Sequence, residues 1–145
     1  MRYIQTELKE LSKIFDENIR IKNIADNCCC AIVALWIMGL DVENLPEMTK
    51  IIASEIGKGL YDDCTVVWAD FFENVSGRKI KVERLKINSL SELKKYKGKI
   101  AVKYTKENNS HWVGVEGGKI KCNSLEHSNC VENGNPTEAR IITFA

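Results

Sequence analysis

The sequence predicts an α+β fold in which helices come first along the chain and an antiparallel sheet follows. Apolar residues recur at helical spacing through residues 3–75, and the spacing changes to a period of two after Gly77. A chain of 145 residues, 44% of them hydrophobic, has the size and composition of one ordinary domain. We therefore expect a single domain over residues 1–145, with N-terminal helices packed on a C-terminal antiparallel sheet.

The N-terminal half contains four predicted helices. They cover residues 3–19, residues 28–40, a segment that opens at Leu45-Pro46, and residues 64–75. Residues 28–40 carry too few polar side chains for a surface helix, so this segment is predicted to be the central, buried helix. Asp26 and Asn27 stand just before it and are expected to cap its N-terminus.

The C-terminal half contains mostly strand patterns. Strands are predicted at residues 79–87, 99–104, 111–116, 119–123 and 140–144. Gly117-Gly118 separates two of them and is typical of a tight hairpin turn. Ser89 followed by Glu92 is a capping signal for a short helix between the first two strands.

The N-terminus and the longest apolar run bear on the compartment. The first twenty residues are charged throughout and lack the apolar stretch of a signal peptide. Residues 28–40, the longest apolar run, are too few to span a bilayer. We therefore expect a cytoplasmic protein that does not bind a membrane and whose six cysteines are reduced thiols.

Basic residues are concentrated in the middle of the chain, although the net charge is only +1. Residues 78–106 carry eleven basic and two acidic side chains. Such a stretch can contact a nucleic acid, but a solvated lysine-rich surface is the more common explanation. Only Tyr96 and Tyr104 are aromatic within it, which disfavours base stacking. Nucleic-acid binding is therefore an alternative that the sequence does not favour.

The strongest candidate for proton transfer is His111, one of two histidines. It begins a predicted strand, and Asn123 ends the next strand across the glycine turn. With the hairpin centred on residue 117, the two side chains are expected to lie opposite each other. An Asn carbonyl can hold an imidazole in one tautomer and leave its other nitrogen free to serve a nucleophile.

The nucleophile for such a histidine is expected among Cys28, Cys29 and Cys30. They lie at the start of the predicted central helix, where the helix dipole and unpaired N–H groups lower the pKa of a thiol. A cysteine in an apolar helix is often only a small core residue. Core packing therefore stays open for each of the three.

These features resemble the papain-like cysteine peptidases, with the closest likeness to small bacterial and phage-borne members related to the leader peptidases of bacteriocin exporters. The resemblance rests on Asn27-Cys-Cys-Cys-Ala-Ile-Val-Ala-Leu opening a helix, on His111-Trp-Val-Gly-Val, and on Asn123-Ser124. It implies a papain-like fold and a Cys-His-Asn triad that cleaves an amide bond of a peptide or protein without a cofactor. The family pattern, with a small residue four positions after the nucleophile, favours Cys30.

The resemblance also implies a residue that donates to the oxyanion. Relatives often have a glutamine about six residues before the nucleophile, but Ile24 stands there relative to Cys30. Asn27 is therefore expected to take this role. Asn23, six residues before Cys29, is the alternative.

Three other interpretations stay open. One is a catalytically inactive protein of the same fold, for example a phage-encoded protein that binds a host protein. A second is a nucleic-acid-interaction module that uses residues 78–106. The third is a zinc site at Cys122, His127 and Cys130, although their spacing matches no common zinc motif. No metal is therefore expected.

Overall fold

The computed structural model of the chain describes residues 3–14 and 24–145. Its helices are α1 (Ile4–Ile14), α3 (Cys29–Ile37), α4 (Leu45–Glu55), α5 (Trp68–Ser76), the short α6 (Asn129–Asn133) and the 3-10 helix η1 (Leu90–Leu93). Its strands are β1 (Ile80–Lys86), β2 (Lys99–Lys106), β3 (Asn109–Glu116), β4 (Lys119–Cys122) and β5 (Asn135–Phe144). The strands form one antiparallel sheet in the order β1-β5-β2-β3-β4.

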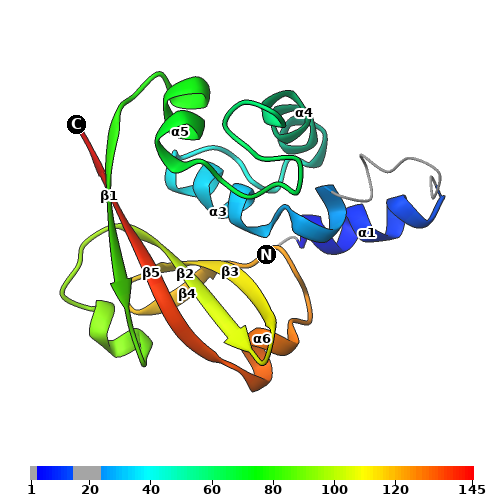
Figure 1. The fold of residues 1–145 in the computed structure, drawn as a ribbon. Coiled ribbons are helices and arrows are strands. Elements are labelled where there is room, and N and C mark those ends of the chain that lie inside the picture. Colours follow the sequence, from blue (N-terminus) through cyan, green and yellow to red (C-terminus); the bar gives the residue numbers. More distant parts are fainter. Residues whose placement is uncertain (1–2, 15–23) are drawn as a thin grey trace.

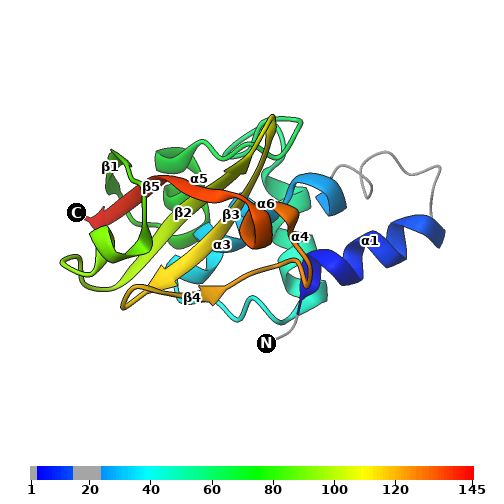
Figure 2. The ribbon, with the colours of Figure 1, turned by 90° about the horizontal axis from the view of Figure 1, so that it is seen from below.

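The sheet separates two groups of helical elements. Helices α3, α4 and α5 lie over one face (Figure 1), and α6 packs against β2, β3 and β5 on the other face, as the view from below shows (Figure 2). The predicted α+β class, with helices first and an antiparallel sheet second, is confirmed. Among the residues described, no helix has the length and apolar character needed to cross a membrane.

Most predicted elements have a counterpart in the structure, and the differences lie at their ends. Residues 15–19 of the first predicted helix fall outside the described part of the chain. Strand β5 begins at Asn135 rather than at Arg140. The polar residues before Arg140 are typical of a loop in sequence, but in the structure they pair with β2. Helix α6 was not predicted, since five residues are too few to show helical periodicity.

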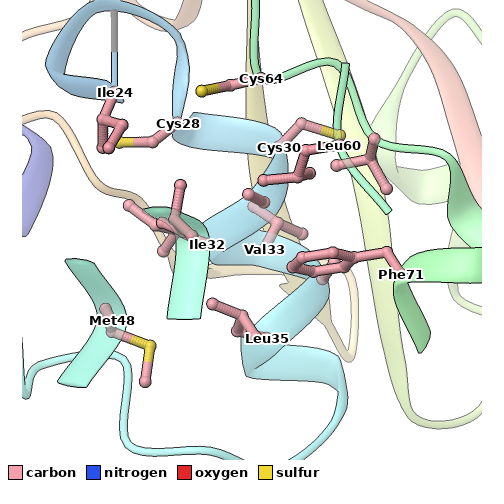
Figure 3. Close-up of a cluster of buried hydrophobic side chains, with 14 of the residues drawn as sticks. Ile24, Cys28, Cys30, Ile32, Val33, Leu35, Met48, Leu60, Cys64 and Phe71 are labelled. Atoms are coloured by element: carbon pink, nitrogen blue, oxygen red, sulfur yellow. The ribbon is translucent and has the colours of Figure 1, made fainter. Parts of the chain in front are cut away.

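Helix α3 lies at the centre of the larger hydrophobic core. Seven of its residues are buried: Cys30, Ala31, Ile32, Val33, Ala34, Leu35 and Ile37. Around them pack apolar side chains of α1, α4, α5 and the sheet, together with Leu60 from the segment between α4 and α5 (Figure 3). The predicted burial of this helix is therefore confirmed.

The predicted cap of α3 is wrong. The residue in the N-cap position is Cys28, not Asp26 or Asn27, and the Cys28 side chain forms no capping hydrogen bond. Residues 24–27 already form a helical turn, and the Cys28 N–H donates to the Ile24 carbonyl at 3.0 Å. Because this turn supplies carbonyl acceptors, a side-chain cap is not required.

Helix α3 approaches β3 most closely at Gly114. A Cβ atom placed on Gly114 would lie 2.5 Å from the Trp36 ring and 2.8 Å from the Cβ of Cys122. Both neighbours belong to elements that flank the candidate site. Glycine at this position therefore sets how near the cysteine-bearing helix lies to the strand that carries His111.

Replacing Gly114 with alanine should destabilise the fold by about 1–3 kcal/mol, because the added methyl group overlaps the Trp36 ring. Urea denaturation measures this change. Trp36→Leu in the same chain should recover part of the loss, since the shorter side chain leaves room for the methyl group. An unchanged urea midpoint for Gly114→Ala would contradict the close approach.

Candidate functional site

His111 and Asn123 are in direct contact. The Nε2 atom of His111 lies 2.9 Å from the Oδ1 atom of Asn123. The predicted contact is therefore confirmed, but the predicted register is not. The tight turn pairs Glu116 with Lys119, and the register then shifts so that Gly114 pairs with Cys122. Asn123 thus follows the last strand pair and reaches His111 diagonally.

The hydrogen-bond partners of Asn123 determine the tautomer of His111. The Asn123 Oδ1 atom also accepts the backbone N–H of Leu125 at 3.1 Å, so it is the carbonyl oxygen of the amide. Because this oxygen can only accept, the Nε2 atom of His111 carries the proton and donates. In the neutral ring, the Nδ1 atom is then left with a free lone pair.

His111 is enclosed, with only 3% of its surface exposed. Burial lowers the pKa of His111, the hydrogen bond to Asn123 raises it by a smaller amount, and the charge of Lys9 lowers it further. The result is a pKa below the usual value of about 6.5. The imidazole is therefore neutral near pH 7 and can accept a proton at Nδ1.

The three neighbouring thiols have different surroundings. The side chain of Cys28 lies beside Ile24, and that of Cys30 points toward Leu60 in the core (Figure 3). Cys29, the first residue of α3, is only half-buried. Of the three, Cys29 alone combines partial exposure with the first helical position.

Cys29 is tied to the strand that carries His111. Strand β4 ends at Cys122, opposite Gly114, so no strand of the described residues lies beside Trp112 on that edge of β3. Cys29 and Trp112 line the same hollow, and the backbone N–H of Trp112 lowers the pKa of the Cys29 thiol. The thiol therefore lies near the strand edge, one residue along the chain from His111.

Burial raises the pKa of all three thiols, most strongly at Cys28 and Cys30. At Cys29, backbone N–H groups of Trp112, Cys30 and Cys29 itself act against this rise. At Cys30, the charges of Arg140 and Lys103 act against it. The raised thiol pKa values and the lowered imidazole pKa mean that both kinds of group are neutral near pH 7.

A hollow of about 450 Å³ opens at the thiols. Cys29, Cys30 and Asn27 contribute to its lining, and His111 does not. Asn27, the predicted oxyanion donor, is exposed at its edge. Cys30, the predicted nucleophile, lines the hollow but is itself buried, so that its role stays a prediction. Asn23 lies outside the described residues.

A buried glutamine that was not predicted joins the two halves of the site. Gln5 in α1 is 1% exposed. Its amide nitrogen donates to the Ala25 carbonyl at 3.0 Å and the Asp26 carbonyl at 3.3 Å, just before the cysteines. Its Oε1 atom accepts the Ser124 hydroxyl at 2.6 Å, next to Asn123. The sequence feature that could have identified Gln5 is the presence of a polar residue on the apolar face of the predicted first helix.

The residues of the zinc hypothesis do not form a metal site. Across the described residues, no three His, Cys, Asp or Glu side chains gather closely enough to hold a metal ion. Cys122 and Cys130 belong to separate hydrophobic clusters on opposite faces of the sheet. His127 is exposed and pairs with Glu132 at 3.3 Å. All six cysteines are free thiols.

Comparison of the chain with protein-family models, curated proteins and solved structures gave no match. The likeness to papain-like peptidases accordingly stays an interpretation of three short motifs.

Titration of His111 tests the electrostatics of the site. We expect its pKa to lie below about 6.5 in imidazole NMR spectra, and Asn123→Ala to lower it further because the hydrogen bond that raises it is lost. A lowered pKa means that the unfolded chain binds the proton more readily. Stability should therefore fall as the pH drops through about 6.5 and level off below the folded-state pKa. His111→Gln should lack this component of the urea midpoint.

Replacing Gln5 with leucine should destabilise the fold by roughly 1–3 kcal/mol, since the buried Ser124 hydroxyl and the Ala25 carbonyl lose a partner. Chemical denaturation of Gln5→Leu, Ser124→Ala and the double variant measures the coupling. The double variant should lose less than the two single losses added together. Additive losses would show that the two side chains do not act as a unit.

Proposed function

We propose that this chain is a papain-like thiol hydrolase that cleaves an amide bond, with Cys29 as nucleophile, His111 as general base and Asn123 as the residue that orients the imidazole. The observation that carries the proposal is the 2.9 Å contact between His111 and Asn123, where His111 precedes Trp112, which lines the same hollow as Cys29. The order cysteine, histidine, asparagine along the chain also supports the proposal, because the papain-like peptidases that the sequence resembles have the same order.

The tautomer of His111 suits this chemistry. With its proton on Nε2 and bonded to Asn123, the imidazole keeps its Nδ1 lone pair for the thiol. As the sulfur of Cys29 bonds to the amide carbon, its proton passes to Nδ1. The proton then goes to the departing amine as the C–N bond breaks. Water hydrolyses the resulting thioester, with His111 again taking and returning a proton.

The neutral state of the pair supports a general-base mechanism. Burial raises the pKa of Cys29 and lowers that of His111, so both groups are neutral at rest. The proton then moves during the attack, as it does from a serine hydroxyl. Asn27 at the edge of the hollow is the proposed side-chain donor to the oxyanion.

Cys29 is preferred to Cys30 on three grounds. It is half-buried whereas Cys30 is buried. It is the first residue of α3, and the backbone N–H groups of Cys29 and Cys30 lower the pKa of its thiol. The backbone N–H of Trp112, the residue after His111, also lowers the pKa of the Cys29 thiol. The side chain of Cys30 instead packs in the core (Figure 3).

A second candidate is an inactive protein of the same fold that binds another protein. One observation favours it: His111 is almost fully enclosed and does not line the hollow that the thiols share. A histidine enclosed in this way fits the role of a packed core residue as well as that of a catalytic group. The free thiols fit the cytoplasmic setting proposed for either candidate.

Thiol reactivity distinguishes the two candidates. With limiting iodoacetamide at mildly alkaline pH, Cys29 should be alkylated before the other five cysteines, as located by peptide mass spectrometry. His111→Ala should slow this reaction by roughly tenfold, because the proton acceptor is removed. The rate should keep rising above pH about 8.5, the usual thiol pKa, because burial raises the pKa of Cys29.

The control variants are Cys29→Ser, which should lose the fast site, and Cys30→Ser, which should keep it. Faster labelling of Cys30 than of Cys29 would instead support Cys30 as the nucleophile, as the sequence predicts. Slow and uniform labelling that is insensitive to His111→Ala would favour the inactive protein.

A further inference from the structure

We propose that the hollow beside Cys29 is a carboxylate-binding subsite built around Arg140, with Arg84 and Lys103, and that the substrate carries a carboxylate close to the amide bond that is cleaved. The link to cleavage rests on the proposed function. The subsite itself rests on the contacts of Arg140.

The three cations lie on adjacent strands and line the same hollow as Cys29. Arg84 in β1 stands directly opposite Arg140 in β5. Lys103 in β2 is diagonal to Arg140, which pairs with Ala101. Like charges directly opposite each other on neighbouring strands are destabilising. An anion between them would remove this repulsion.

Arg140 has a hydrogen-bond donor that no described residue satisfies. It is only 8% exposed, and its Nε–H, itself buried, has no hydrogen-bond partner among the residues that the structure describes. Its terminal nitrogens reach the Ala139 carbonyl at 3.3 Å and Glu138 at 3.4 and 3.5 Å. Glu138 also pairs with Lys103 at 3.2 Å, so one carboxylate is shared between two cations.

A buried N–H without a partner costs about 1–3 kcal/mol, and more on a charged group. The guanidinium plane is held by Trp112, whose ring centroid lies 5.2 Å from the Arg140 Cζ atom. A fixed guanidinium with a spare N–H suits the two oxygens of a carboxylate. Arg140 therefore lines the hollow as a positioned guanidinium whose hydrogen-bond donors are not all satisfied by the described residues.

The cations also lie close to the thiols. Burial raises the pKa of Cys30, and the charges of Arg140 and Lys103 act in the opposite direction. A carboxylate bound at Arg140 would lie in the hollow that Cys29 also lines. The volume of about 450 Å³ is enough for an acidic side chain or for a C-terminal residue.

The lining of the hollow disfavours an extended polyanion. Asp26 and Asp63 also contribute to its wall. Their charges would repel a chain of phosphates, whereas a single carboxylate can avoid them. We therefore favour a peptide carboxylate over a nucleic acid as the ligand.

Binding to the subsite can be measured without any cleavage. Three probes of nearly equal size are titrated into the full chain and followed by amide and indole NMR signals near Arg140 and Trp112. N-acetylglutamate α-amide offers a side-chain carboxylate, N-acetylglutamine offers a C-terminal carboxylate, and N-acetylglutamine amide offers neither. We expect one of the first two to bind, which identifies the source of the carboxylate, and the neutral probe not to bind.

Variants connect this binding to Arg140. Arg140→Gln should weaken it by roughly tenfold or more, because a charge-assisted hydrogen bond is lost. Arg140→Lys keeps the charge but not the planar fork and should be intermediate. Lys119→Gln, an equal charge change on the exposed β4 that does not line the hollow, should have no effect.

Proximity to the thiol is tested with a matched pair of alkylating reagents. Iodoacetate is anionic and iodoacetamide is neutral, and both carry the same reacting carbon. The rate ratio of iodoacetate to iodoacetamide at Cys29 should exceed the ratio for free cysteine and fall in Arg140→Gln.

The outcomes separate the two proposals. Carboxylate binding together with an unreactive Cys29 would support the carboxylate subsite and contradict the proposed hydrolase activity. A reactive Cys29 without carboxylate binding would remove the subsite alone. Salt-dependent shifts with an oligonucleotide, and none with the carboxylate probes, would overturn the subsite in favour of nucleic-acid binding.

Discussion

The structure depends on enclosing one helix that has no polar face. Helix α3 is buried along almost its whole length, so it must be covered on every side. The sheet covers one side, and apolar residues of α1, α4 and α5 cover the others. The same enclosure sets the chemistry at its N-terminus. The backbone N–H groups at this end lower the pKa of the Cys29 thiol, while desolvation raises it by more.

Three buried polar side chains show how differently the fold treats such groups. Gln5 has partners for both ends of its amide, so it joins α1 to the segments before Cys28 and after Asn123. His111 is bonded at one nitrogen. Arg140 has a buried nitrogen with no partner in the described residues. A polar group with all its hydrogen bonds made stabilises the structure, whereas a group with an unused hydrogen-bond donor or acceptor is suited to chemistry or binding.

The sequence predicted the order of elements and the contact between His111 and Asn123, because period and turn residues are local signals. It did not predict which thiol lies at the edge of β3. Consecutive helical residues point about 100° apart, so three adjacent cysteines face three directions, and a one-residue shift in the helix start exchanges them. It also missed Gln5, whose partners are far away along the chain and are set by tertiary packing.

The position of β5 in the sheet has a consequence for how the chain is made. Strand β5 lies between β1 and β2 and supplies the neighbour of β1 within the sheet. During synthesis, β2, β3 and β4 can pair as soon as they emerge, but β1 must wait until Asn135–Phe144 leaves the ribosome. Until then the apolar side chains of β1 and the helices above it lack a finished sheet. Long-range pairing of this kind slows folding in general, and we expect the apolar surface of β1 to stay uncovered until β5 is made.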